Sequence, residues 1–154
     1  MRLKIAAALL AVALSASAFA QIKPEDQIKF RQSGYTFMGW NMAKLKGMLV
    51  DNPASFNKEQ AQAAANVVAA VANSGMGALY GAGTDKGKGW KETRLKSEFF
   101  QKPDEVKVVA VNFAKEANEL AKVAATGDAA ALKVQFAKTG DACGACHKKF
   151  RRDE

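Results

Sequence analysis

Near its C-terminus the chain reads Cys143-Gly144-Ala145-Cys146-His147, and His147 is its only histidine. Residues i, i+3 and i+4 share one face of an α-helix, so two thiols and one imidazole can address a single flat ligand. Cys-x-x-Cys-His is the attachment motif of c-type haem, in which the thiols form thioethers and the histidine binds iron. The motif predicts one covalent haem c per chain, attached through Cys143 and Cys146, with His147 as the axial ligand of the metal.

Other uses of a Cys-x-x-Cys pair fit this sequence less well. A thioredoxin-like redox pair needs a βαβ context, which the sequence pattern lacks. A structural zinc site needs about four ligands, whereas the motif offers two thiolates and one imidazole. In an oxidising compartment the two cysteines could instead form a disulfide. Haem attachment needs an adjacent histidine and an exported chain, and the sequence predicts both.

The first twenty residues are typical of a secretory signal peptide. Arg2 and Lys4 precede an apolar run at 5–14, and Ala18-Phe19-Ala20 supplies an Ala-x-Ala cleavage site. We expect removal of residues 1–20 by cleavage after Ala20, a single mature domain at 21–154, and a periplasmic location. A retained anchor is the weaker alternative. The apolar run is too short for a membrane span, and no other run is long enough.

The basic charge of the chain is consistent with an acidic partner. The formal net charge is +8; the signal segment holds two of the 23 basic residues and none of the 15 acidic ones, leaving 21 basic and 15 acidic residues, or +6. Such a surface can attract an acidic redox partner protein or an anionic membrane surface. Nucleic-acid binding is not expected, because the chain is exported and has no aromatic-basic platform.

Apolar residues that recur every three to four positions predict four helices, and no strand pattern is evident. The predicted helices begin at Pro24 and end by Asp51, run over 58–74, begin at Pro103 and end near Thr126, and run over 129–151. Short connections within the first and last pairs make each pair antiparallel. The fold class is therefore predicted as all-α, an antiparallel up-down-up-down four-helix bundle with haem near the C-terminal helix.

A long glycine-rich loop over 75–89 separates the two helix pairs, and a short helical turn is expected within 93–100. The loop lacks the Gly-Lys-Ser/Thr ending and the preceding strand of a phosphate-binding loop. We interpret it as a connector.

The chain resembles cytochrome c′, a class II c-type cytochrome. The resemblance rests on the C-terminal motif with the following Phe150-Arg151, and on Lys23-Pro24-Glu25-Asp26 with Phe30-Arg31-Gln32-Ser33. It spans the whole mature chain, and cytochrome c′ is itself a standard example of the four-helix bundle, so the fold expectation is not independent of the family. In ordinary small cytochromes c the haem motif lies near the N-terminus instead.

The resemblance also implies roles for residues outside the motif. Arg151 would lie near the proximal face of the haem, and Arg31 and Gln32 near its propionates. Tyr35 matches the position facing the sixth coordination site, where many members have leucine or another apolar residue and methionine-ligated relatives have methionine. From sequence alone, Arg31 could instead snorkel at a bundle edge. The 75–100 loop departs from the family pattern, with Trp90 earlier than expected, so no haem contact is transferred from it.

The sequence leaves three functions open. The missing second histidine and Tyr35 favour a five-coordinate, high-spin haem iron, and the resemblance implies binding or buffering of nitric oxide, with carbon monoxide as a related ligand. The same five-coordinate haem could also carry single electrons. Alternatively, the protein is a low-spin electron-transfer cytochrome in which Met38 or Met42 ligates iron, although such methionines more often fill a core. An enzyme, such as a weak peroxidase or nitric oxide reductase, is not expected, because no acid or second histidine lies near Tyr35.

The resemblance further implies a homodimer packed through the first two helices. The outward candidates are Phe37, Trp40, Met48 and the alanine-rich second helix, all of which could equally belong to the core.

Overall fold

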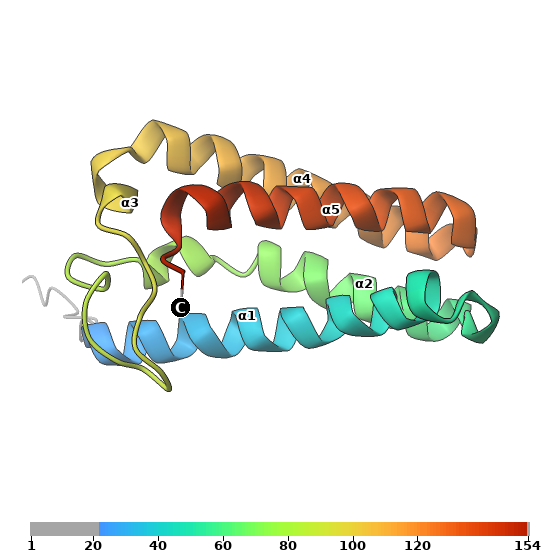
Figure 1. The fold of residues 1–154 in the computed structure, drawn as a ribbon, viewed down its shortest axis with the longest axis horizontal. Coiled ribbons are helices and arrows are strands. Elements are labelled where there is room, and N and C mark those ends of the chain that lie inside the picture. Colours follow the sequence, from blue (N-terminus) through green and yellow to red (C-terminus); the bar gives the residue numbers. More distant parts are fainter. Residues whose placement is uncertain (1–21, 154) are drawn as a thin grey trace, which may run out of the picture.

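The computed structural model describes residues 22–153, which form an elongated bundle of four long helices (Figure 1). The predicted signal peptide and its cleavage site lie outside the described residues. The elements, in chain order, are α1 (Pro24–Lys46), η1 (Gly47–Asp51), η2 (Pro53–Ser55), α2 (Lys58–Ala72), η3 (Met76–Leu79), α3 (Glu98–Gln101), α4 (Pro103–Thr126) and α5 (Ala129–Phe150).

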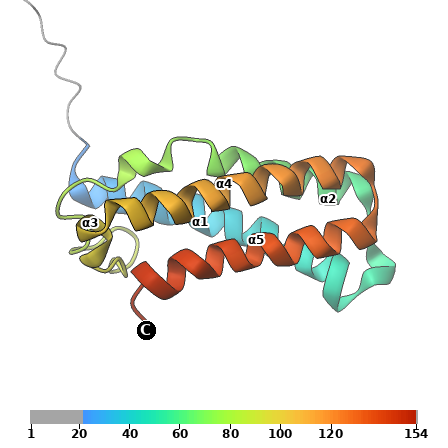
Figure 2. The ribbon, with the colours of Figure 1, turned by 90° about the horizontal axis from the view of Figure 1, so that it is seen from above.

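The four long helices confirm the all-α prediction. α1 packs against α2, α2 against α4, and α4 against α5, as the two views in Figures 1 and 2 show. Between residues 22 and 153 there is no β-strand, only two isolated bridges, Lys88 with Glu92 and Leu95 with Arg151. No helix in that range is both long and apolar enough to cross a lipid bilayer.

The helix ends follow the signals in the sequence. Pro24 and Pro103 occupy the first helical positions of α1 and α4, where a missing N–H costs no hydrogen bond. The Asp128 carboxylate accepts a hydrogen bond of 2.9 Å from the Ala131 amide and so caps α5. Gly127, at φ +81°, supplies the left-handed turn between α4 and α5.

The predicted bounds of α2, α4 and α5 are therefore correct to within one or two residues. The sequence predicts a first helix that ends by Asp51, whereas α1 ends at Lys46 and the chain continues to Asp51 as the π-helical turn η1. The turn expected within 93–100 is α3 at 98–101.

Alanine residues on α2 let the neighbouring helices approach closely. Ala61, Ala64, Ala65 and Val68 have no exposed surface and belong to one core cluster with residues of α1, α4 and α5. Small side chains bring helix axes together, and dense packing leaves little room for a larger group. The alanine-rich face of α2, one of the candidates for a dimer contact, is therefore used inside the chain.

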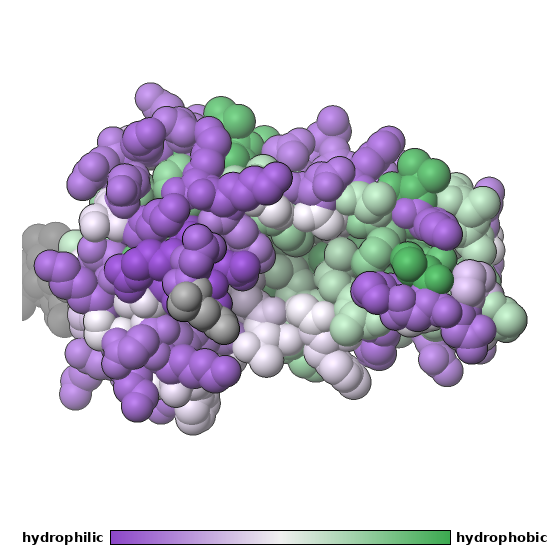
Figure 3. All heavy atoms as spheres, viewed as in Figure 1, coloured by the Kyte–Doolittle hydropathy of each residue, from purple (hydrophilic) through white to green (hydrophobic). Residues whose placement is uncertain are grey.

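α1 and α5 are neighbours in the bundle that make little direct contact with each other. Figure 3 shows pale and green surface, from less polar and apolar residues, lining a recess between them, with hydrophilic residues gathered at the end that holds the C-terminus. At the opposite end η1 packs against α5 and closes the bundle. The bundle is therefore open along one side, between α1 and α5.

We expect Ala64→Leu to lower the free energy of unfolding by about 1–3 kcal/mol, because the larger side chain overpacks the contact of α2 with its neighbours. Urea denaturation followed by circular dichroism measures the change. Ala63→Leu is the matched control: Ala63 lies one position away on the exposed side of α2, and its substitution should change stability by less than about 0.5 kcal/mol. Equal effects of the two substitutions would contradict the packing argument.

Candidate haem-binding site

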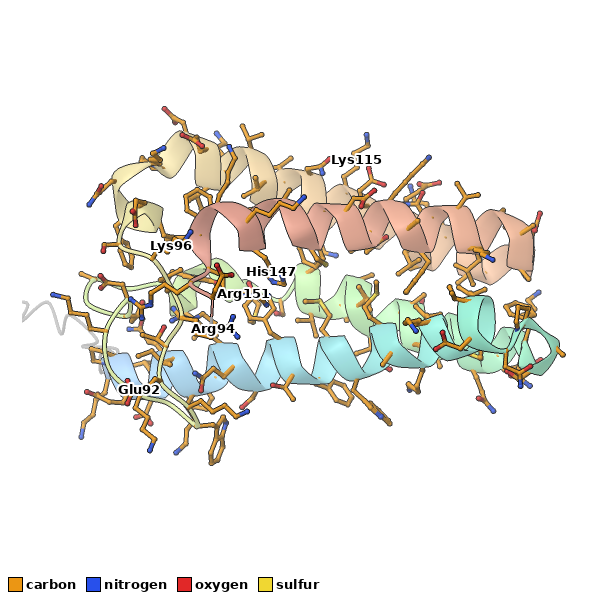
Figure 4. All side chains as sticks on the ribbon, in the orientation of Figure 1. Glu92, Arg94, Lys96, Lys115, His147 and Arg151 are labelled. Carbon is orange, nitrogen blue, oxygen red and sulfur yellow. The ribbon has the colours of Figure 1, made fainter. Side chains whose placement is uncertain are left out.

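The C-terminal end of α5 carries the Cys-x-x-Cys-His motif. Cys143 and Cys146 are half-buried free thiols, and His147 projects from α5 into the space between α5 and α1 (Figure 4). Burial raises the pKa of both thiols, so the motif carries protonated thiols rather than thiolates. Burial, with smaller contributions from the Arg151 and Arg94 cations, lowers the pKa of His147 and favours the neutral imidazole, which is the form that ligates a metal.

The residues of the motif fit covalent haem better than a bare metal ion. Within residues 22–153 no three or more histidine, cysteine, aspartate or glutamate side chains gather as a metal cluster. A Cβ atom built on Gly140 or Gly144 would meet no heavy atom of another part of the chain within 4 Å, so the space beside this part of α5 is open. Two free thiols, a neutral imidazole and open space beside the helix are what covalent haem requires.

Tyr35 lies on α1, across the gap from the motif. Its hydroxyl is 2.9 Å from the hydroxyl of Tyr80, and either group can donate the hydrogen bond. Burial is the main cause that raises the pKa of Tyr35, and the hydrogen bond with Tyr80 opposes it; the Cys146 and Cys143 thiols raise it further. The two thiols of the motif therefore lie close enough to Tyr35 to influence the pKa of its hydroxyl, although they are more than 100 residues away in the sequence.

Arg31, one turn before Tyr35, is buried and binds the end of η3 and the loop over 80–97 that follows it. Its Nη1 donates to the Leu79 carbonyl and the Thr84 hydroxyl, both at 3.1 Å. Its Nη2 donates to the Thr84 carbonyl at 2.8 Å and to the Thr93 hydroxyl at 3.0 Å. Only 5% of Arg31 is exposed, so the alternative that it snorkels at a bundle edge is wrong. A buried guanidinium is tolerated because its donors are hydrogen-bonded.

Gln32 binds the same loop from the next position of α1. Its side-chain oxygen accepts hydrogen bonds from the amides of Trp90 and Lys91, and its nitrogen donates to the Lys91 carbonyl. The loop lies so close to α1 that a Cβ atom on Gly89 would come within 2.6 Å of the Lys29 amide nitrogen. Arg31 and Gln32 thus both attach the loop to α1, and their contact with haem propionates stays a prediction.

Basic side chains surround His147 at the end of α5. A cavity of about 300 Å³ is lined by Lys96, His147, Lys148, Arg151 and Asp153. Figure 4 shows Arg151 and Arg94 close to His147. Arg151 therefore lies beside the predicted iron ligand, and its contact with a haem stays a prediction.

Sequence reasoning missed Tyr80 and the aromatic residues that continue from it. Phe99 stacks on Tyr80 with ring centroids 4.5 Å apart, and Phe150 of α5 meets Phe99 edge-on at 5.6 Å. Burial, followed by the proximity of Tyr35, raises the pKa of Tyr80, so its hydroxyl stays protonated at physiological pH. The one hint in the sequence was that the chain has only two tyrosines, Tyr35 and Tyr80.

The methionines of α1 and η1 face the core. Met38 is buried in the core cluster, and Met42 is half-buried against it. Met48 is also buried in that cluster, so the interpretation of Met48 as an outward dimer contact is wrong. Phe37 and Trp40 are 50% and 56% exposed and remain available for a partner.

Comparison with known proteins agrees with this site. Residues 26–151 match the model of the family described as Cytochrome C′. The cytochrome c′ of Allochromatium vinosum is 54% identical over 147 residues, which cover 95% of this chain and 94% of that protein. These matches confirm the resemblance deduced from the two ends of the sequence. They also agree with the prediction of a haem-carrying protein rather than an enzyme.

Solved structures give the same answer. A cytochrome c′ described as having ligand-controlled dimer dissociation is 54% identical, with a TM-score of 0.81 over 86% of this chain and 98% of that one. The cytochrome c′ of Alcaligenes xylosoxidans is 26% identical, with a TM-score of 0.74 over 86% of this chain and 98% of that one. That protein has been solved with nitric oxide and, in another variant, with carbon monoxide.

We expect Arg31→Lys to loosen the loop, because one ammonium group cannot reach the Leu79, Thr84 and Thr93 acceptors together. The free energy of unfolding should fall by about 1–3 kcal/mol, the cost of leaving buried acceptors unpaired. Hydrogen exchange should accelerate at the loop amides, for example that of Thr93, while amides in α4 keep their protection. Unchanged exchange in the loop would show that Arg31 does not attach it.

Proposed function

Since the chain belongs to the cytochrome c′ family, we propose that it is a periplasmic haem protein that binds small diatomic gases and passes single electrons. One haem c per chain would be attached through Cys143 and Cys146, with His147 as the axial ligand. Bound in this way, the haem supplies an iron centre that binds nitric oxide or carbon monoxide and changes between ferrous and ferric states.

The main support for this proposal is that Tyr35 on α1 lies across the gap from the Cys-x-x-Cys-His motif on α5. The half-buried thiols and the single imidazole lie on α5. Tyr35 lies on α1, close enough to the thiols for them to raise the pKa of its hydroxyl. Tyrosine restricts access without supplying the thioether or second imidazole that would make a strong sixth ligand. The arrangement therefore favours a five-coordinate iron whose free position is open to small gases.

The low-spin alternative would need a methionine on α1 to turn toward the motif. Met38 and Met42 pack in or against the core formed with α2, α4 and α5. Moving Met38 out of the core would leave a cavity, and such cavities typically cost several kcal/mol. The placement of the methionines thus supports the gas-binding form. The nitric oxide and carbon monoxide complexes of the Alcaligenes xylosoxidans protein support it as well.

Electron transfer is supported by the charge around His147. Lys96, Lys148 and Arg151 lie around the same cavity as the imidazole. A positive surface at this end of the bundle speeds encounter with an acidic redox partner. A five-coordinate haem can serve both roles, so gas binding does not exclude electron transfer.

Export and a homodimer complete the proposal. Residues 1–20 would act as a signal peptide cleaved after Ala20, which leaves residues 21–154 as the periplasmic domain. Phe37 and Trp40 stack with ring centroids 5.7 Å apart on the exposed side of α1, and we assign the dimer contact to this pair. The dimer dissociation described for a 54% identical relative supports the existence of a dimer.

We expect the reduced holoprotein to show a broad high-spin Soret band that sharpens when carbon monoxide is added. The reason is an iron with no strong sixth ligand from the chain. Absorption spectra of the ferric and dithionite-reduced protein, before and after carbon monoxide, make the measurement. Sharp α and β bands that carbon monoxide leaves unchanged would instead identify a strong sixth ligand, and Met38 or Met42 would then be tested by substitution.

We expect Trp40→Glu to shift the protein from dimer to monomer, because it removes a large exposed ring and places a charge in the contact. Sedimentation velocity at micromolar concentration measures the shift. Trp90→Glu is the matched control, since Trp90 is 63% exposed and lies on the loop rather than on the Phe37–Trp40 pair. A monomeric unaltered protein would contradict the dimer, and a monomeric Trp90→Glu variant would contradict the assigned contact.

A further inference from the structure

Tyr80 lies in the middle of a row of aromatic residues that crosses from α1 to α5. The row begins at Tyr35 on α1, whose hydroxyl is 2.9 Å from that of Tyr80. It continues through Phe99 of α3, stacked on Tyr80 at 4.5 Å, to Phe150 at the end of α5, 5.6 Å from Phe99. We call Tyr35, Tyr80, Phe99 and Phe150 the aromatic bridge. Because α1 and α5 make little direct contact, this bridge is a physical connection between them beside the Cys-x-x-Cys-His motif.

The ring of Tyr80 is tightly placed. The Arg31 guanidinium lies over it, with its carbon 4.5 Å from the ring centroid, and Phe99 stacks on it at the same distance. Arg31 also donates to the carbonyl of Leu79, the residue that precedes Tyr80. The cation–π contact, the stacking and the backbone hydrogen bond together leave the Tyr80 hydroxyl at a defined position.

Tyr35 is less tightly placed than Tyr80. It keeps 38% of its surface exposed, and it sits on α1 directly after Gly34. Among the described residues, the hydrogen bond with Tyr80 is the one side-chain hydrogen bond of Tyr35. The position of the Tyr35 ring beside the gap therefore depends on Tyr80.

We infer that Tyr80 is a positioning residue that controls gas access by fixing Tyr35 through the hydrogen bond between their hydroxyls. The inference rests on the proposed function and adds to it a residue on the loop. A gas that enters behind Tyr35 requires the Tyr35 ring to move, and that movement breaks the bond to Tyr80. A hydrogen bond between neutral groups changes an equilibrium by a factor of about two to ten.

The test is the rate of carbon monoxide association with the reduced, fully haem-loaded protein, measured by stopped-flow absorption. Tyr80→Phe removes one hydroxyl and keeps the ring against Arg31 and Phe99. We expect association to be about two to ten times faster than in the unaltered protein. Tyr35→Phe removes the same bond, so the double variant should be no faster than the faster of the two single variants.

Ser33→Ala is the matched control. The Ser33 hydroxyl accepts a hydrogen bond of 2.8 Å from Trp90 Nε1, which attaches the same loop to α1 without touching either tyrosine. Its loss should leave carbon monoxide association unchanged. A rate increase in Ser33→Ala equal to that in Tyr80→Phe would assign the effect to general loosening of the loop and overturn the role of Tyr80.

A second readout needs no gas. Thermal unfolding of the ferric variants should show a non-additive double-mutant cycle for Tyr35→Phe and Tyr80→Phe, since both remove one shared bond. Additive effects, or an unchanged or slower association rate in Tyr80→Phe, would overturn the inference while gas binding itself stands. If the unaltered protein bound no carbon monoxide, the proposed function would fail and this inference with it.

Discussion

The rest of the structure depends on how α1 and α5 are kept apart at one end of the bundle. α2 and α4 carry most of the packing, and the fully buried alanines of α2 bring α1 and α4 close to it. α5 then packs on α4 and makes little direct contact with α1, to which it is joined mainly through η1 at one end of the bundle and the loop at the other. This uneven packing leaves an open side into which the imidazole of His147 projects.

Arg31 shows how a single buried charge organises the open side. Its guanidinium satisfies acceptors on Leu79, Thr84 and Thr93 and lies over the ring of Tyr80. Charge-assisted hydrogen bonds of this kind are strong because the donor is ionised and desolvated. One side chain of α1 therefore attaches a loop that is rich in glycine and has little regular structure. The same loop also reaches α5, where the Lys96 amide donates a hydrogen bond of 2.9 Å to the Phe150 carbonyl.

The loop is where sequence reasoning was least informative. We expected it to act as a connector, and it does connect α2 to α4, but it also brings Tyr80 and Phe99 to the candidate site. Its backbone path is set by side chains of α1 more than 40 residues earlier, and no local pattern reveals such pairings. The burial of Met48 could not be predicted from the sequence either, because an apolar residue near a helix end is compatible with either a core or an interface.

The sequence by itself determined the helices and the chemistry of the motif. Prolines, capping residues and the 3.6-residue period depend on neighbours along the chain, so the start of α1 and the bounds of α2, α4 and α5 could be predicted closely. The spacing of Cys143, Cys146 and His147 is local in the same way, and so is the resemblance to cytochrome c′ that it carries. Only the tertiary structure decided what faces the motif: the Tyr35–Tyr80 hydrogen bond and the attachment of the loop by Arg31 join residues 45 to 62 positions apart. Such contacts form when helices pack and a loop closes over them, and neither event is encoded in the period of any one segment.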